Sequence, residues 1–288
     1  MPAFETITPN QLLGHGEAGQ WPIEQYALRF LAQGDSWFSI GSFPFFATTN
    51  LFEHMGTSRR GLVVNCARPG ATLAHMTDLV KASDFQRLLC GSTEFAWDGL
   101  LLSGLGNDVI DALSSQSPDP KLRLLNPAAE WGPEGSPLRY VSEPGWQTFE
   151  QHARDVYANL LAMRARSRFN RNVPIITHTY DLATPRNAGA APAIGPWLYK
   201  ALGKTYGVPE HDWIGLATEF LRRVADLILD IQSTTPHMHV VSTQQTLTAA
   251  LTTDAGPTPH WANEIHPSPA GYELLAQRWN PQLDQLYP

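Results

Sequence analysis

Cysteine, charged residues and long hydrophobic runs are all scarce in this sequence. Cys66 and Cys90 are the only cysteines among 288 residues, which excludes a disulfide scaffold, and we expect both to be buried free thiols. No run approaches the roughly 18 uninterrupted apolar residues that predict a transmembrane helix. Residues 1–20 lack the basic region and the apolar core of a signal peptide. We therefore expect a cytoplasmic protein without a membrane span.

The sequence also lacks a cluster of positive charge. Its formal net charge is −7, and only 16% of its residues are charged. This counts against nucleic acid or an anionic membrane as the main partner and favours a neutral or cationic small molecule. Because 43% of the residues are hydrophobic, the chain is globular, and its length fits one α/β domain.

Short apolar runs alternate with amphipathic stretches along the chain. Each run ends in small or polar residues, as buried parallel strands do, and the expected strands cover 28–33, 62–66, 100–103, 173–178 and 237–242. Between them the apolar residues have helical spacing, and the expected helices cover 21–26, 71–81, 84–89, 109–113, 147–166, 212–232 and 269–278. The alternation predicts an α/β fold, a doubly wound parallel sheet in a single domain over residues 1–288.

Two segments rich in proline and glycine, near 114–146 and 182–197, interrupt this alternation. Closely spaced prolines prevent regular helices and strands. We interpret both segments as insertions at the carboxyl edge of the sheet. Long loops in a compact domain are often functional, so each is a candidate lid or substrate wall.

The first expected strand ends in the tripeptide Gly34-Asp35-Ser36. Ligands bind at the carboxyl ends of the strands in open α/β sheets, so a serine on a glycine-assisted turn at this place is positioned to be a nucleophile. We expect Asp35 to hold the turn by accepting hydrogen bonds from backbone N–H groups.

Further polar residues stand where other strands end. Gly70 follows the second strand and Asn107 follows the third, while His178 and Tyr180 end the fourth. His266 precedes the last helix. A serine hydroxyl is a poor nucleophile without a base, and histidine has the pKa that this task requires.

These blocks, in this order and spacing over residues 28–278, resemble those of the SGNH (GDSL-type) hydrolase superfamily. The resemblance implies a flavodoxin-like, three-layer α/β/α sandwich around a five-stranded parallel sheet, and hydrolysis of esters through an acyl-serine. It implies that Ser36 is the nucleophile and His266 the general base. The oxyanion hole would consist of the Ser36 and Gly70 backbone N–H groups and the Asn107 side-chain amide. No cofactor and no metal are implied.

The sequence departs from the family pattern at two positions. Asn263 stands where the family has an aspartate three residues before its histidine, and Leu105 stands where it has a glycine two residues before its asparagine. An aspartate fixes the histidine tautomer and stabilises the imidazolium, and a neutral asparagine can orient the ring through its carbonyl oxygen. Our hypothesis is that Asn263 or a main-chain carbonyl orients His266, with Glu264 and Asp181 as the alternative acids.

Four questions stay open in the sequence. The ester could carry an acyl or aryl group or be an O-acetyl group on a carbohydrate, and the oligomeric state is not indicated. His178 and Tyr180 could line the substrate pocket or form structural hydrogen bonds. Because of Asn263, a catalytically silent domain that binds a carbohydrate or a protein is the alternative function.

If His266 is the base and is unperturbed, activity should fall below about pH 6.5.

Overall fold

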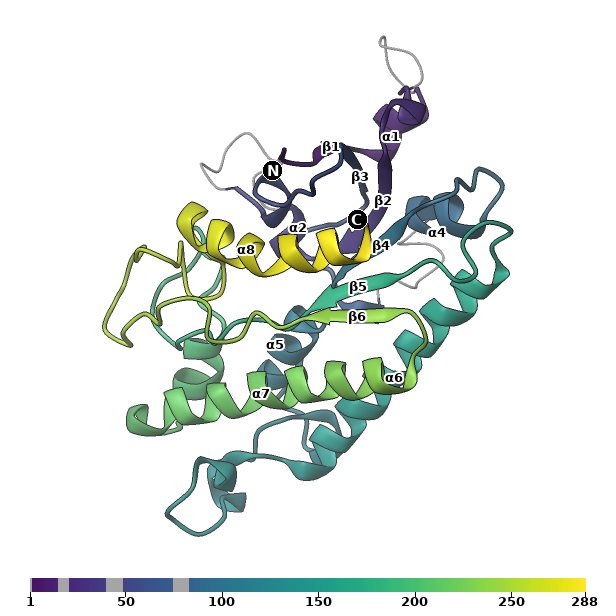
Figure 1. Ribbon diagram of the computed structural model, residues 1–288. Helices are drawn as coiled ribbons and strands as arrows, with labels where there is room; N and C mark the ends of the chain where they lie inside the picture. Colours follow the sequence, from purple (N-terminus) through teal and green to yellow (C-terminus); the bar gives the residue numbers. More distant parts are fainter. Residues whose placement is uncertain (1, 15–20, 40–48, 75–82) are drawn as a thin grey trace.

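A six-stranded parallel sheet forms the centre of the molecule (Figure 1). The computed structural model describes residues 2–14, 21–39, 49–74 and 83–288. The strands are β1 (Glu5–Ile7), β2 (Leu28–Gly34), β3 (Gly61–Asn65), β4 (Gly99–Ser103), β5 (Ile175–His178) and β6 (Met238–Val241), in the spatial order β1-β3-β2-β4-β5-β6. Every neighbouring pair is parallel, which confirms the predicted α/β class.

The prediction of five strands is wrong by one. All five expected strands are present, and β1 is added at the edge beside β3, where Glu5 pairs with Leu62 and Ile7 with Val64. The sequence analysis treats this region as irregular because a strand of three residues is too short to show an alternating pattern. The additional strand lies at the far edge from β6 and leaves the order of the other five unchanged.

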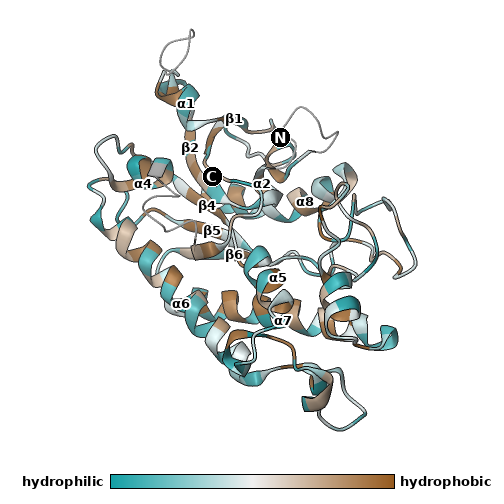
Figure 2. Ribbon diagram, turned by 180° about the vertical axis from the view of Figure 1, so that it is seen from behind, coloured by the Kyte–Doolittle hydropathy of each residue, from teal (hydrophilic) through white to brown (hydrophobic). Residues whose placement is uncertain are grey.

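Helices cover both faces of the sheet, so the fold has the expected three layers. Alternate residues of β4 separate the two cores: Leu101 packs with the residues of α8 (Pro269–Leu286), and Leu100 and Leu102 pack with the other helices. Those on the second face are α4 (Ser83–Cys90), α5 (Gly106–Ser114), α6 (Glu143–Arg166) and α7 (Glu210–Thr234). Figure 2 shows hydrophobic and hydrophilic residues alternating along α6 and α7, as expected for helices with one buried face.

Capping residues explain where two of the long helices, α6 and α8, begin. The Ser142 side chain accepts a hydrogen bond from the Gly145 N–H at the start of α6, and the Ser268 side chain accepts one from the Gly271 N–H at the start of α8. The expected helix over 71–81 lies largely outside the described residues. The expected helix over 21–26 is a single 3-10 turn, Ile23–Gln25, and two further short helices are α1 (Pro9–Leu12) and α2 (Ser36–Ser39). Cys66 and Cys90 are free thiols, the first buried and the second half-buried.

The first insertion, 114–146, contains three 3-10 turns, Pro120–Leu122, Ala128–Glu130 and Pro137–Tyr140. The first of them packs against α6 and the third against α7. The second insertion, 182–197, has no helix or strand and leads through a cis Gly195–Pro196 bond to a π-helical turn, Lys200–Thr205. Among the described helices, none is long and apolar enough to cross a membrane.

The chain reverses its direction of winding between β2 and β4. From β2 it proceeds to β3 on one side, and from β4 to β5 and β6 on the other. In doubly wound sheets a crevice opens at this switch point, outside the carboxyl ends of the two strands. Ser36 follows β2 and Asn107 follows β4, so the fold places both of these predicted site residues at that crevice.

Candidate active site

The turn that carries Ser36 requires a close approach of β2 and β4. A Cβ atom on Gly34 would lie 2.9 Å from the Ser103 Cβ atom, so only glycine fits here without displacing β4. The Asp35 N–H donates to the Ser103 carbonyl oxygen at 3.1 Å. The chain then turns into α2, with Ser36 as its first residue.

Asp35 stabilises this turn by accepting hydrogen bonds, as expected. Its Oδ1 accepts hydrogen bonds from the Trp37 N–H at 3.0 Å and from the Ser103 hydroxyl at 2.9 Å, and its Oδ2 accepts one from the Tyr180 hydroxyl. His178 Nε2 lies 3.0 Å from the same Ser103 hydroxyl. Burial raises the pKa of Asp35 to about 6 even though these hydrogen bonds favour the carboxylate. Four buried polar side chains thus form one network directly behind the nucleophile.

Ser36 and His266 meet across the crevice although 230 positions separate them. The Ser36 Oγ lies 2.8 Å from His266 Nε2, within the range in which a general base can take the proton. Both side chains are buried. Burial lowers the pKa of His266 to about 4 because it disfavours the charged ring. The ring is therefore neutral, and able to act as a base, at neutral pH.

Asn263 orients the His266 ring. Its Oδ1 lies 3.0 Å from His266 Nδ1 and also accepts hydrogen bonds from the backbone N–H groups of Ile265 at 3.1 Å and His266 at 3.0 Å. Because two backbone N–H groups donate to this atom, it is the amide oxygen that faces the ring. Nδ1 therefore carries the ring proton, and the lone pair of Nε2 faces the Ser36 hydroxyl.

The two alternative acids are engaged elsewhere. The Glu264 carboxylate accepts hydrogen bonds from four backbone N–H groups, those of Arg186, Trp197, Leu198 and Tyr199. The Asp181 carboxylate also accepts four, from the N–H groups of residues 182, 245, 246 and 247. Neither carboxylate has a hydrogen bond to His266 among the described contacts, so the geometry supports Asn263 as the orienting residue.

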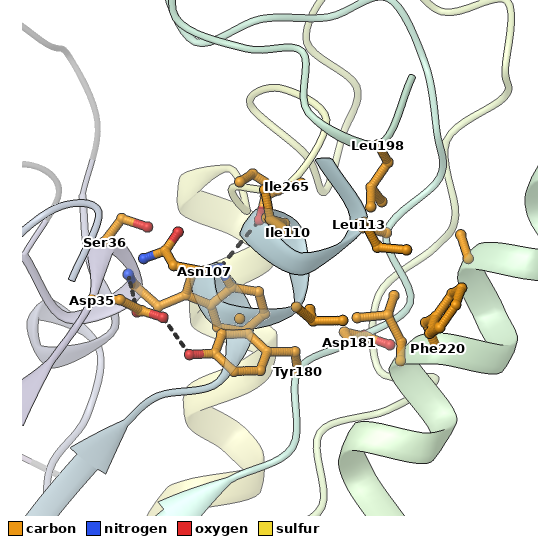
Figure 3. A pocket seen from close by; sticks show the side chains of 16 residues that line it. Asp35, Ser36, Asn107, Ile110, Leu113, Tyr180, Asp181, Leu198, Phe220 and Ile265 are labelled. Carbon is orange, nitrogen blue, oxygen red and sulfur yellow. Dashed lines mark hydrogen bonds between the residues drawn. The ribbon is translucent and has the colours of Figure 1, made fainter. Parts of the chain in front are cut away.

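The candidate oxyanion donors are placed unequally. Asn107 lies beside Ser36 (Figure 3), and its Nδ2 donates one hydrogen bond to the Ala71 carbonyl at 2.9 Å, which leaves the second N–H of that amide for a ligand. The Ser36 N–H is at the first position of α2, where a helix has no internal acceptor for it. Gly70 lies in an exposed turn with a φ of +73° and does not line the pocket beside Ser36, so its role stays a prediction.

Leu105 stands where the family pattern has a glycine, and its backbone conformation is strained. Its φ is +83°, in the left-handed region that glycine adopts freely. A non-glycine residue there costs on the order of 1–2 kcal/mol. The Leu105 side chain is buried in the core on the α5 face, and this burial offsets the strain, so the turn into α5 still forms.

Of the two residues expected at the pocket, Tyr180 lines it and His178 does not. His178 is fully buried, stacks on Trp37 and Phe38, and has a pKa lowered to about 4 by desolvation. It lies in the core beneath the site and does not line the pocket. Tyr180 does line the pocket while its hydroxyl donates to Asp35. The structure thus separates a structural histidine from a tyrosine in the pocket wall.

A small apolar pocket opens beside the nucleophile (Figure 3). Ser36 and Asn107 lie at one end and Leu113, Leu198 and Phe220 at the other. Its free volume is about 40 Å³. No residue of 114–146 lines it, whereas Ala183 of the second insertion does. In the described structure, only the second insertion therefore forms part of its wall.

Two further residues of the site do not belong to any sequence motif. Arg186 is fully buried, and its Nη2 donates to the Asn263 carbonyl oxygen at 2.6 Å, which holds the loop that bears His266. The Trp197 ring packs edge-on against the His266 ring, with centroids 5.5 Å apart. Both belong to the second insertion, whose irregular sequence gave no signal for either role.

Comparisons with known proteins give similar folds but no close relative. No protein-family model and no curated protein sequence match the chain. The chain is similar to a structure from Parabacteroides merdae whose provisional description is a GDSL-like lipase, with 16% identity, coverage of 91% of this chain and 97% of that one, and a TM-score of 0.46. It is also similar to an extracellular lipase from Streptomyces rimosus, with 15% identity, coverage of 87% and 99%, and a TM-score of 0.44.

A third similar structure is an acetyl-xylooligosaccharide esterase from Geobacillus, with 14% identity, coverage of 91% and 95%, and a TM-score of 0.46. Another is provisionally described as an SGNH hydrolase. At these values the likeness is one of overall architecture, and the chemistry of the site rests on its own geometry.

Proposed function

We propose that this protein is a serine hydrolase that cleaves carboxylic esters through an acyl-serine intermediate on Ser36. The observation that carries the proposal is the aligned row of Ser36 Oγ, His266 and Asn263, with separations of 2.8 Å and 3.0 Å. A row of this kind activates a serine hydroxyl. The partner is a small-molecule ester with an acyl or aryl group, or an O-acetyl group on a carbohydrate.

The acylation step follows from these positions. The Ser36 Oγ attacks the ester carbonyl carbon while its proton passes to His266 Nε2, and Asn263 Oδ1 accepts a hydrogen bond from the imidazolium that forms. The carbonyl oxygen becomes an oxyanion, which the Asn107 amide and the Ser36 N–H stabilise by hydrogen bonds. The C–O bond to the alcohol then breaks, and His266 returns the proton to the leaving oxygen.

Deacylation repeats these steps with water as the nucleophile. His266 takes a proton from the water, the resulting hydroxide adds to the acyl carbon, and the carboxylic acid leaves as Ser36 regains its proton. The pKa of about 4 for His266 means that the base is ready at neutral pH but that forming the imidazolium is costly. The neutral Asn263 offsets less of this cost than an aspartate would.

Covalent labelling with a fluorophosphonate, followed by peptide mass mapping, tests the proposal. We expect the label on Ser36 in the wild type and in Ser39→Ala, and none in Ser36→Ala. Ser39 is the matched control, because it is a buried serine on the same short helix. A folded wild type that takes no label would refute the proposal and favour the alternative, a silent domain that binds a carbohydrate or a protein.

A further inference from the structure

The pocket beside Ser36 limits what the acyl group can be. Ser36 and Asn107, the candidate nucleophile and oxyanion donor, both lie on its rim, whereas His266 does not line it. The leaving oxygen must lie near His266 Nε2 to receive its proton, so the alcohol is on the His266 side. The acyl chain, the remaining substituent of the reacting carbon, is therefore directed into the pocket.

The pocket wall presents almost no polar group to this chain. Asp35 and Asp181 both line it, but all of their oxygen atoms accept hydrogen bonds from the protein. The Tyr180 hydroxyl is bound to Asp35. Apart from Ser36 and Asn107 on the rim, the other lining side chains are apolar, among them Val109, Ile110, Leu113, Leu198, Phe220 and Ile265. A charged or hydroxylated acyl group would lose its hydration here without gaining a partner.

The far end of the pocket is closed. Leu113, Leu198 and Phe220 lie opposite Ser36 and Asn107 (Figure 3), and all three are buried in the core. The free volume of about 40 Å³ is roughly three times the space that one water-sized probe occupies. It therefore holds a few methyl or methylene groups.

We propose that the enzyme is selective for short, apolar acyl groups, from acetyl to butyryl, and that Phe220 and Leu113 set the limit on length. This inference rests on the proposed function. Ala217 of α7 also lines the pocket, so a larger side chain at that position would shorten the pocket from the same helix that carries Phe220.

The test is a series of p-nitrophenyl esters from acetate to octanoate, assayed for kcat/KM. We expect the wild type to cleave acetate and butyrate well and hexanoate at least tenfold less well. Phe220→Leu should raise the hexanoate-to-acetate ratio about tenfold. Ala217→Leu should lower the butyrate-to-acetate ratio by a similar factor, which keeps the test decisive if Phe220→Leu does not fold.

Phe149→Leu is the matched control, since Phe149 is a buried phenylalanine next to Trp146, as Phe220 is, but does not line this pocket. Its chain-length profile should equal that of the wild type. A wild type that prefers octanoate, or a profile that neither pocket variant changes, would overturn the inference while fluorophosphonate labelling of Ser36 still supports a serine hydrolase. A lack of labelling would instead refute the proposed function itself.

Discussion

Asn263 Oδ1 lies 3.0 Å from His266 Nδ1. The same oxygen also accepts hydrogen bonds from two backbone N–H groups of its own loop. An asparagine therefore occupies the place and the orientation of an acid. The loop has fixed the amide oxygen toward the ring, so the tautomer that the chemistry needs is present without a negative charge.

Replacing Asn263 with aspartate tests how much the missing charge matters. In Asn263→Asp the carboxylate should stabilise the imidazolium, raise the pKa of His266 and increase kcat. We expect a gain of roughly 10- to 100-fold, less than the 10⁴-fold difference known for this exchange in a serine protease, because Asn263 already holds the correct tautomer. An unchanged or lower kcat, with the pKa of His266 raised, would show that the site is built around the amide.

As the pH falls, activity should be lost at a lower pH than the sequence suggests. His266 acts as a base only when neutral, and burial lowers its pKa to about 4, not the ordinary value of about 6.5. We expect kcat/KM, which reports the pKa of the free enzyme, to stay level as the pH falls through 6 and to decline near 4. Circular dichroism at each pH separates this loss from unfolding, and a limb near 6.5 in folded protein would contradict it.

Asn107 should contribute to the transition state more than to substrate binding. Removing one oxyanion donor lowers kcat by about 10²- to 10³-fold, so we expect Asn107→Ala to show this loss with a nearly unchanged KM. Asn126→Ala is the control, since Asn126 also donates through Nδ2 to a backbone carbonyl but lies in the first insertion. Equal losses in the two variants would mean that Asn107 is structural.

The bond between Tyr180 and Asp35 should stabilise the fold in a pH-dependent way. The Tyr180 hydroxyl donates to a buried carboxylate whose pKa is about 6. Above that pH Tyr180→Phe leaves a charged oxygen without its donor, at a cost of about 1–3 kcal/mol in the free energy of unfolding. Below it the carboxyl is protonated, and the cost should be smaller.

Chemical denaturation at pH 8 and pH 5 measures this difference. Tyr140→Phe is the control because it also removes a tyrosine–aspartate bond, to Asp212, but that partner is only partly buried. Its cost should be similar at the two pH values. A cost for Tyr180→Phe that does not change with pH would show that Asp35 keeps one protonation state across this range.

The strands and long helices were predictable because their signals are local. Runs such as those in β3 and β4 are apolar on both faces, and α6 and α7 repeat apolar residues with helical spacing over many turns. The strand β1 has three residues and no such repeat. Ser36, Asn107 and His266 were predictable as a group because short blocks mark the strand ends and helix starts that position them.

The partner of His266 could not be decided from the sequence. Asn263, Glu264 and Asp181 were all compatible with the spacing, and the direction of each side chain depends on backbone N–H groups supplied by distant loops. Glu264 is next to Asn263 in the chain yet binds residues 186 and 197–199. The role of the buried Arg186 depends on carbonyl groups more than 60 positions away, which no local pattern encodes.

The hydrogen bonds of the Glu264 carboxylate also affect which changes in the neighbouring loop the fold tolerates. It binds the N–H of Arg186 and the N–H groups of residues 197–199, so one side chain ties together the two ends of the segment between them. The residues from 187 to 196 then form a loop whose two ends are held together by Glu264. Because extending a flexible loop costs little free energy, we expect insertions in this segment to leave the position of His266 unchanged.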